Sequence, residues 1–280
     1  MTIQWFPGHM QDTESFLKET LSNVDVVMEI IDARLPASSS NPVLDQMCKS
    51  VLRIKVLNKQ DLADPVITEQ WLEHFKYVNN CAAISITGTN VSDAWRALEF
   101  ALAAFNASKA VKSRSRRLRV MVVGIPNTGK STIINTLVGK KVAKTGNVPA
   151  ITRHQQRTSL KNKVDIYDTP GILWAVIEDK NGAYRLAASG AISDAAIDYS
   201  DIAVFVIKYL IEKYPDSFKD RYKISNIDDI NMILEKIGAA RGCLKKGGVV
   251  DLQKASELLI RELRSGKLGR ITLESPEDFL

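Results

Sequence analysis

The chain has 280 residues, of which 45% are hydrophobic and 25% are charged. This composition is ordinary for a globular protein with a full core, and the length predicts one or two domains. The first ten residues lack the basic start and apolar run of a signal peptide, and the most apolar stretch, 202–211, contains Lys208 and is too short to span a bilayer. We therefore expect a cytoplasmic protein that does not enter membranes.

The basic surplus favours a polyanionic partner without requiring one. The net charge is +6 and the pI is about 9.1. Residues 106–119 contain six Lys or Arg and no acid, and residues 139–163 contain seven and no acid. A third basic cluster comprises Arg261, Arg264, Lys267 and Arg270. Such clusters suit a phosphate backbone, although a merely solvated surface is the alternative because no aromatic-interleaved RNA module is present.

Cysteine usage points to no metal or disulfide site. Cys48, Cys81 and Cys243 are odd in number and scattered. They lack metal-ligand spacing, so we expect reduced thiols.

Short β-branched runs alternate with amphipathic segments through the first 174 residues. This alternation predicts an α/β fold with a mostly parallel sheet and helices on both faces. The expected strands are 25–32, 52–57, 81–85, 119–124 and 164–167, and the expected helices are 43–49, 68–75, 91–105 and 130–138.

The pattern changes after Trp174. Apolar residues then recur at helical spacing near 202–214 and again over 252–263. The last helix is predicted to start at Asp251 and to stop at Gly266, which are suitable capping residues. We therefore predict two domains, an α/β domain over 1–174 and a smaller all-helical domain over 175–280.

The segment Gly124-Ile-Pro-Asn-Thr-Gly-Lys-Ser131 matches the phosphate-loop pattern G-x-x-x-x-G-K-[ST]. It lies between a predicted strand and a predicted helix, as this pattern requires. Its backbone N–H groups and the helix N-terminus would face nucleotide phosphates, Lys130 would reach the β- and γ-phosphates, and Ser131 would ligate Mg²⁺. The candidate nucleotide-binding residues here are Asn127, Thr128, Gly129, Lys130, Ser131 and Thr132.

A second motif, Asp168-Thr-Pro-Gly171, follows a predicted strand. Asp168 could hold Mg²⁺ through water, and the Gly171 N–H could contact the γ-phosphate. Between the motifs, Thr152 is the candidate for a second Mg²⁺ hydroxyl, with Thr145 as a competitor.

Asn58-Lys-Gln-Asp61 directly follows another predicted strand. The Asp61 carboxylate can accept hydrogen bonds from the ring N–H and the amine of guanine, whereas adenine would leave that charge unpaired. The stem of Lys59 could pack on the base, and Ser85, at a later strand end, could complete the pocket. Together with a phosphate loop, the tetrapeptide predicts guanine binding.

The order of these motifs is circularly permuted, since the guanine reader precedes the phosphate loop. With Trp5-Phe-Pro-Gly-His-Met10, Asp32-Ala-Arg34 and Gly266-Lys-Leu-Gly-Arg270, the motifs closely resemble the YlqF-type ribosome biogenesis GTPases over essentially the whole chain. Ala150 departs from the family's usual Pro-Gly-x-Thr, which puts the path of the loop before Thr152 in question.

The resemblance implies a GTPase that binds a large ribosomal subunit precursor and its rRNA, promotes a late maturation step and leaves upon hydrolysis of GTP to GDP. It also implies an rRNA-contacting helical domain and slow turnover that the ribosome stimulates. Neither DNA nor a membrane is an expected partner, and we expect a monomer.

Hydrolysis needs a group that positions water, and the position after Gly171 holds Ile172 instead of glutamine. The resemblance points to His9 as a catalytic candidate beside Lys130, Thr152 and Gly171, and to Asn127 as a K⁺ ligand. Two alternatives remain. One is a P-loop kinase or ATPase acting on a small substrate, and the other is an rRNA-binding scaffold that holds GTP with negligible hydrolysis.

Overall fold

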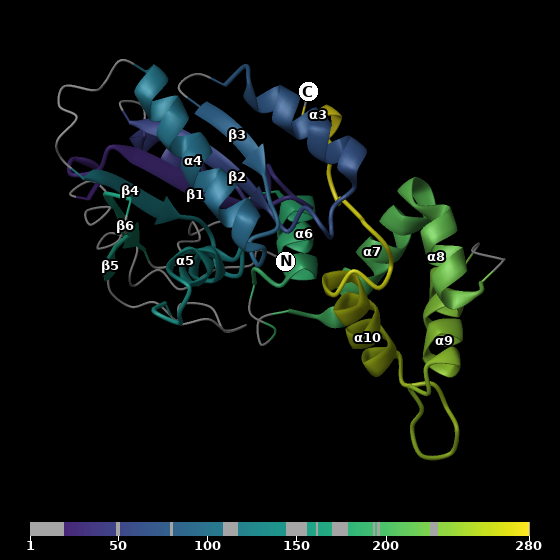
Figure 1. Cartoon of the computed structure of the whole chain (residues 1–280). Coiled ribbons are helices and arrows are strands. Elements are labelled where there is room, and N and C mark those ends of the chain that lie inside the picture. Colours follow the sequence, from purple (N-terminus) through teal and green to yellow (C-terminus); the bar gives the residue numbers. More distant parts are fainter. Residues whose placement is uncertain are drawn as a thin grey trace.

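The computed structural model describes residues 20–48, 51–78, 81–108, 117–143, 156–160, 162–169, 179–192, 194, 197–224 and 229–279. A sheet flanked by helices lies beside a group of helices from the later part of the chain (Figure 1). Within the described ranges, no helix is long and apolar enough to cross a membrane.

The sheet has six strands in the order β3-β2-β1-β4-β6-β5. Neighbouring strands pair in parallel except β5 and β6, which are antiparallel. This arrangement confirms the predicted, mostly parallel α/β sheet. The strand bounds are β1 Val26–Asp32, β2 Leu52–Asn58, β3 Cys81–Ser85, β4 Leu118–Val123, β5 Gln156–Ser159 and β6 Val164–Asp168.

Helices cover both faces of the sheet because the central strand β1 presents apolar side chains on both of its faces. Val26, Met28 and Ile30 pack in one hydrophobic cluster with residues of α4 and α5, whereas Val27 and Ile31 belong to clusters on the other face with α2 and α3. Burial on two faces suits the largely hydrophobic sequence of β1, which Glu29 interrupts. The helix bounds are α2 Pro42–Met47, α3 Pro65–Phe75, α4 Val91–Ala107 and α5 Lys130–Val138.

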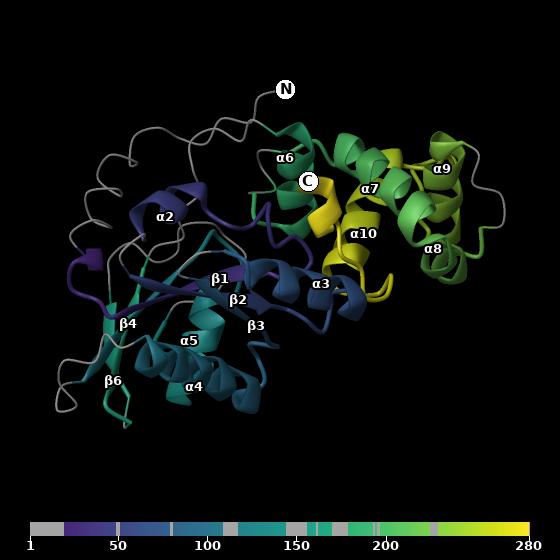
Figure 2. The ribbon, with the colours of Figure 1, turned by 90° about the horizontal axis from the view of Figure 1, so that it is seen from above.

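The later part of the chain is helical, as predicted, and Figure 2 shows it beside one end of the sheet. Its hydrophobic cluster also contains Leu35 and Ile125, from the loops after β1 and β4, so the two parts share a core. The elements are α6 Lys180–Ser189, α7 Tyr199–Lys213, α8 Pro215–Tyr222, α9 Ile230–Ala240, α10 Leu252–Arg264 and the 3₁₀ turn η3 Pro276–Phe279.

The predicted ends of the last helix are confirmed. The side chain of Asp251 caps α10 by accepting a hydrogen bond from the backbone N–H of Lys254, and Gly266 follows the helix with a φ of 74°. The other elements α6, α8, α9 and β5 were not individually predicted. The boundary proposed at residue 174 lies in 170–178, outside the described residues, and remains a prediction.

After α10 the chain returns to the sheet region. The backbone N–H of Leu273 donates to the Arg34 carbonyl at 2.7 Å, and the indole N–H of Trp71 donates to the Glu274 carbonyl at 3.1 Å. The C-terminal turn lies beside α3 in Figure 1 and beside α6 in Figure 2. The C-terminal residues therefore fasten the helical part of the chain to the loops around the sheet.

Glu274 is a fully buried carboxylate at this junction. It accepts hydrogen bonds from the backbone N–H groups of Ala37 and Ser38, at 2.6 and 2.9 Å, and from the Ser38 hydroxyl. The Arg185 guanidinium lies 3.6 Å away. Burial nevertheless outweighs these partners and raises the pKa of Glu274 to about 6.

We expect the substitution Glu274→Gln to change how stability depends on pH. The folded-state pKa of about 6 exceeds the ordinary value of 4.5, so the folded chain binds this proton more tightly and loses stability as the pH rises through that window. The variant has no such group. The free energy of unfolding of the wild type, minus that of the variant, should therefore fall by about 2 kcal/mol between pH 4 and 7.

Urea denaturation across this pH range measures the free energy of unfolding of both proteins. The contributions of the other titrating groups are common to both and cancel in the difference. Glu277→Gln, which removes an exposed carboxylate of η3, is the matched control. A constant difference between the wild type and Glu274→Gln would contradict the expectation.

Candidate nucleotide site

The predicted phosphate loop and the predicted guanine reader meet at one edge of the sheet. β2 and β4 flank β1 and run parallel to it, so the loops that follow all three strands emerge at their carboxyl ends. This edge is where open parallel sheets bind ligands. The sequence motifs at 58–61 and 124–131 thus lie on one site.

The phosphate loop requires glycine at its two ends. Gly124 has a φ of 147°, and a Cβ there would lie 2.3 Å from the carbonyl oxygen of Ile30. Gly129 has a φ of 98°, and a Cβ there would lie 2.2 Å from Nδ2 of Asn58. Only a residue without a side chain fits both positions, because the loop passes so close to its neighbours.

Asn58 ties the guanine reader to the phosphate loop. Its Nδ2 donates to the Thr128 carbonyl at 2.7 Å, and its Oδ1 accepts from the Gly88 N–H at 2.8 Å. The residue is 3% exposed. Asn58 therefore links three loops from a buried position, with both its amide nitrogen and its amide oxygen hydrogen-bonded within the protein.

Lys59 makes a second link through its ammonium group. Nζ donates to the Asn127 carbonyl in the phosphate loop and to Oδ2 of Asp32 at the end of β1, each at 2.8 Å. Asp32 in turn accepts a two-pronged ion pair from Arg34, at 2.9 and 2.7 Å. Although burial raises the pKa of Asp32, Arg34 and Lys59 together hold that pKa well below its usual range.

Lys130 and Asp168 are the residues predicted for the phosphate and metal side of the site, and each influences the charge state of the other. Lys130 is buried and its Nζ donates to the Ile125 carbonyl at 2.8 Å, across the loop that phosphates would fill. Burial lowers the pKa of Lys130 to about 8, although Asp168 opposes this shift. Burial also raises the pKa of Asp168 to about 6, with Lys130 opposing.

The side chain of Asp168 has the chemistry to bind a cation. Both of its carboxylate oxygens are buried, and neither has a hydrogen-bond partner among the described residues. An unpaired buried carboxylate is costly unless a cation compensates it. The half-buried Ser131 lies in the first turn of α5, so a carboxylate and a hydroxyl are available as donors that fit Mg²⁺.

The remaining predicted residues lie around this core. Asn127 has a φ of 61°, and its Nδ2 donates to the Gly190 carbonyl at the end of α6 at 2.6 Å. The hydroxyl of buried Thr128 donates to Ile125, and Thr132 is half-buried in the first turn of α5. Ser85 ends β3, next to β2.

Three predicted site residues lie outside the described residues, namely His9, Thr152 and Gly171. Thr145, Ala150 and Ile172 also lie there, so their roles remain predictions. In the described part of the chain, no group of three or more His, Cys, Asp or Glu forms a further metal site.

The sequence alone did not give Asp32 and Arg34 a role, although their tripeptide contributed to the resemblance. The available signal was Asp32 at the end of a buried strand, where a parallel sheet brings loops together. The pairing of its carboxylate with Lys59, 27 residues away, depends on strand order.

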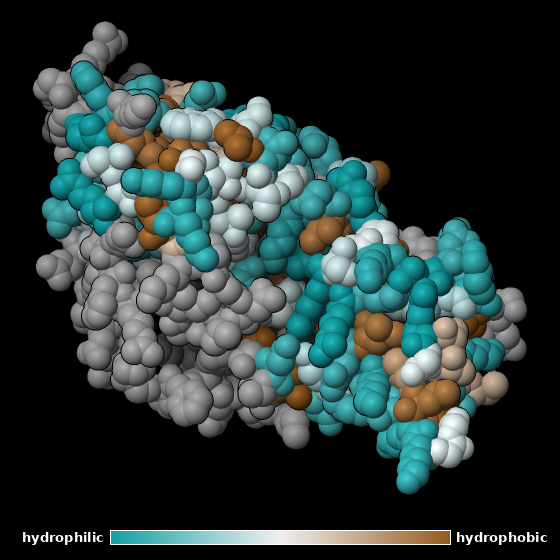
Figure 3. Space-filling view, turned by 60° about the horizontal axis from the view of Figure 1, so that its bottom comes forward, coloured by the Kyte–Doolittle hydropathy of each residue, from teal (hydrophilic) through white to brown (hydrophobic). Residues whose placement is uncertain are grey.

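Two members of the C-terminal basic cluster are engaged within the protein. Arg264 donates to the Ala187 and Ala188 carbonyls at 2.8 and 3.0 Å, and Arg270 donates to the Gln60 and Ala63 carbonyls, both at 2.8 Å. Lys267 is exposed. On the face shown in Figure 3, hydrophilic residues predominate and hydrophobic residues form separate spots.

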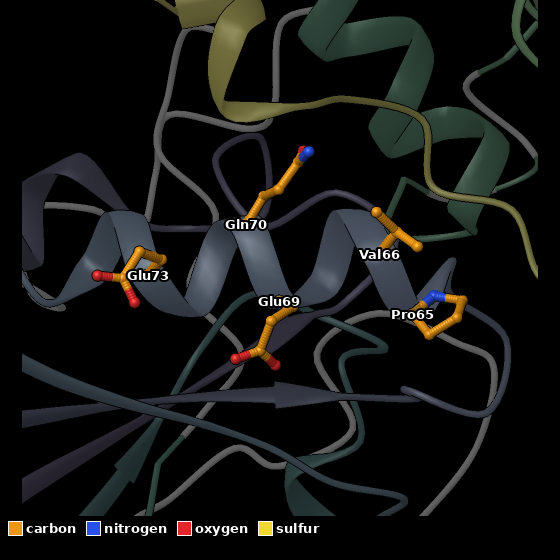
Figure 4. Close-up of a pocket in the computed structure, with 5 residues that line it drawn as sticks. All are labelled: Pro65, Val66, Glu69, Gln70 and Glu73. Atoms are coloured by element: carbon orange, nitrogen blue, oxygen red, sulfur yellow. The ribbon is translucent and has the colours of Figure 1, made fainter.

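A surface hollow lies apart from these motifs, along the exposed side of α3 (Figure 4). All of its lining residues come from that helix, namely Pro65, Val66, Glu69, Gln70 and Glu73. None of them belongs to the predicted nucleotide motifs.

Gly129→Ala should destabilise the chain more than Gly139→Ala does. Both glycines have left-handed backbones, with φ of 98° and 71°, so both variants incur conformational strain. Only at Gly129 does the new methyl group meet a neighbour, because no atom lies within 4 Å at Gly139. We expect an additional loss of about 1–3 kcal/mol in the free energy of unfolding, measured by urea denaturation. Equal losses would argue against the close packing of Asn58 on the phosphate loop.

Comparisons with known proteins agree with this geometry. A family model described as a 50S ribosome-binding GTPase matches residues 119–240. The ribosome biogenesis GTPase A of Bacillus cereus is 43% identical, with 100% of this chain and 96% of the relative covered.

Two solved structures of YlqF are also similar. The GDP-bound form is 33% identical with a TM-score of 0.68, covering 94% of this chain and 100% of the other. The GNP-bound form from Thermotoga maritima is 32% identical with a TM-score of 0.68, covering 95% and 99%. On the full-length identity, the shared fold and the motifs in their permuted order, the chain belongs to the ribosome biogenesis GTPase A family.

Proposed function

We propose that the chain is a GTP-hydrolysing assembly factor that binds the large ribosomal subunit precursor, promotes a late step of its maturation and leaves upon hydrolysis. The observation that carries the nucleotide part is the direct bonding of the guanine reader to the phosphate loop. Asn58 contacts Thr128, and Lys59 contacts Asn127. We infer that a nucleotide extends from Lys130 at its phosphate end to Asp61 at its base end.

The carboxylate of Asp61 favours guanine over adenine as the bound base. It is exposed, and its carboxylate accepts no hydrogen bond from the described residues. The base would therefore find a free acceptor held beside the Lys59 stem. Adenine would present its N1 acceptor and a C–H group to that carboxylate in place of two N–H donors, which disfavours the kinase or ATPase alternative.

On the phosphate side, Lys130 would exchange its bond to Ile125 for contacts with β- and γ-phosphate oxygens. Ser131, Thr152 and Asp168 would hold Mg²⁺, which supplies positive charge against the phosphates. The Gly171 N–H would contact the γ-phosphate and His9 would position water. Asn127 would contribute its Oδ1 to a K⁺ site, with its Nδ2 kept on Gly190.

The ribosomal part of the proposal is supported by the family and by the basic clusters. The family description names the large subunit, and the relatives' name specifies ribosome biogenesis. The segments 106–119 and 139–163 carry no acid beside their basic residues. The cytoplasmic location and monomeric state expected from the sequence are further parts of this proposal.

Asp61→Asn should reverse the choice of base. Asparagine replaces one acceptor with an N–H donor, which suits xanthine, whose C2 carbonyl replaces the guanine amine. We expect the Kd for GDP to rise at least tenfold, a loss of about 1.4 kcal/mol or more, and xanthosine diphosphate to bind more tightly than GDP. Fluorescence titration measures both, with Glu69→Gln, an exposed carboxylate of α3, as the control. Unchanged GDP affinity would remove Asp61 as the base reader.

GTP turnover should be slow for the chain alone, faster with large subunits and faster in KCl than in NaCl. Phosphate release measured in these conditions separates the remaining possibilities. Equal rates in the two salts would remove the K⁺ role of Asn127. No turnover even with subunits would favour the GTP-holding scaffold.

Subunit co-sedimentation should weaken steeply as salt rises, because Lys and Arg contacts to phosphates release counterions.

A further inference from the structure

The motif Gly266-Lys-Leu-Gly-Arg270 and the residues after it have no role in the function proposed above. We call residues 266–274 the C-terminal strap and residues 60–64 the reading loop. The strap leaves α10 and lies against the reading loop, which contains Asp61. Figure 4 shows the C-terminal segment passing near the start of α3, directly after that loop.

The strap satisfies the carbonyl groups on both sides of Asp61. The Arg270 guanidinium donates to the Gln60 carbonyl through Nη2 and to the Ala63 carbonyl through Nε, each at 2.8 Å. The Ile271 N–H donates to the Leu62 carbonyl at 2.9 Å. Three carbonyls of a five-residue loop are therefore held by two consecutive residues that lie about 200 positions later in the chain.

Two further contacts close the same interface. The backbone N–H of Asp64 donates to the Thr272 hydroxyl at 2.9 Å. Gly266 lies so close to Leu62 that a Cβ there would be 2.7 Å from its Cδ2. The strap thus contacts the reading loop from end to end, through backbone groups and packed side chains.

Asp61 itself has less support. Its side chain is exposed and accepts no hydrogen bond from the described residues, and the Arg34 guanidinium acts on it through charge alone. The placement of its carboxylate therefore depends on the backbone of the reading loop. A carboxylate that must meet two N–H groups of a base depends on accurate placement. The groups that fix the backbone around Asp61 consequently determine how well it reads the base.

The strap also contacts the ion-pair chain behind the loop. Its Leu273 N–H donates to the Arg34 carbonyl, and Arg34 pairs with Asp32, which holds Lys59. Lys59 and Asp61 are two of the residues expected to contact the base. The same strap therefore supports both of them.

We propose that the C-terminal strap is part of the guanine-recognition machinery, with Arg270 as a positioning residue that orients Asp61 through the Gln60 and Ala63 carbonyls. The inference rests on the proposed guanine-binding function. It adds that the base end of the site is built in part with residues from the end of the chain. A partner that draws the helical part of the chain away would loosen the reading loop and weaken guanine binding.

The test compares the binding of GDP and inosine diphosphate to the full chain. Inosine lacks the C2 amine from which Asp61 would accept a hydrogen bond. The ratio of the two Kd values therefore reports how accurately the Asp61 carboxylate is placed. We expect Arg270→Ala to raise the Kd for GDP about tenfold and to reduce the preference for GDP over inosine diphosphate severalfold. Partial unfolding would weaken both nucleotides equally and leave the ratio unchanged.

Lys267→Ala is the matched control, because it removes the same charge from an exposed position on the same strap. Thr272→Val is a second test variant, which removes the acceptor for the Asp64 N–H at similar volume. It should also lower the preference for GDP, and it keeps the test decisive if Arg270→Ala does not fold.

The outcomes separate the two proposals. If the wild type prefers GDP over ADP but both strap variants keep its GDP-to-inosine diphosphate ratio, the positioning role is overturned and the proposed function stands. If the wild type does not prefer GDP over ADP, the guanine site fails, and the role of the strap fails with it. A reduced ratio in the strap variants with an unchanged ratio in Lys267→Ala is the result expected.

Discussion

The carboxylate of Asp32 is the interaction on which the arrangement of this site depends. It is buried at the end of the central strand, between the strands that lead to the guanine reader and to the phosphate loop. One oxygen pairs with both Lys59 and Arg34, and the other also binds Arg34. Removing one partner from such a buried ion cluster leaves an uncompensated charge, which costs several kcal/mol. The cluster therefore fixes the separation between the two ends of the nucleotide site.

The same principle extends to the junction with the helical part of the chain. Buried Glu274 is held by two backbone N–H groups, a hydroxyl and Arg185. Leu273, beside it, is bonded to Arg34. Ion pairs and carbonyl contacts, in addition to hydrophobic packing, thus join the C-terminal residues to the loops of the sheet. Such directional contacts specify one relative placement more sharply than apolar burial alone, because each leaves a polar group unsatisfied when it breaks.

The side chains of the site fall into two sets, those that are hydrogen-bonded within the protein and those that are not. Asp168 and Asp61 have no hydrogen-bond partners in the described part of the chain, whereas Asn58 and Lys59 are bonded to the phosphate loop. Asn58 and Lys59 hold the loops in place through these hydrogen bonds. The two carboxylates remain available to a cation and to a base. In the proposed function, the tetrapeptide 58–61 therefore serves both as a structural link and as the reader of the base.

The sequence by itself determined the α/β class, most strands and helices and the order of the motifs, and it predicted which residues form the nucleotide site, because these depend on local spacing. β-branched runs predicted β1 to β4 and β6, and the glycine pattern predicted the phosphate loop. Polar β5 and the short α8, which begins with Pro215, lack such a periodic signal. Only the tertiary structure decided that Asp32 joins Lys59 to Arg34 and that Arg270 holds the loop around Asp61. These contacts join residues up to 210 positions apart, and strand order and helix packing, which local patterns do not encode, bring them together.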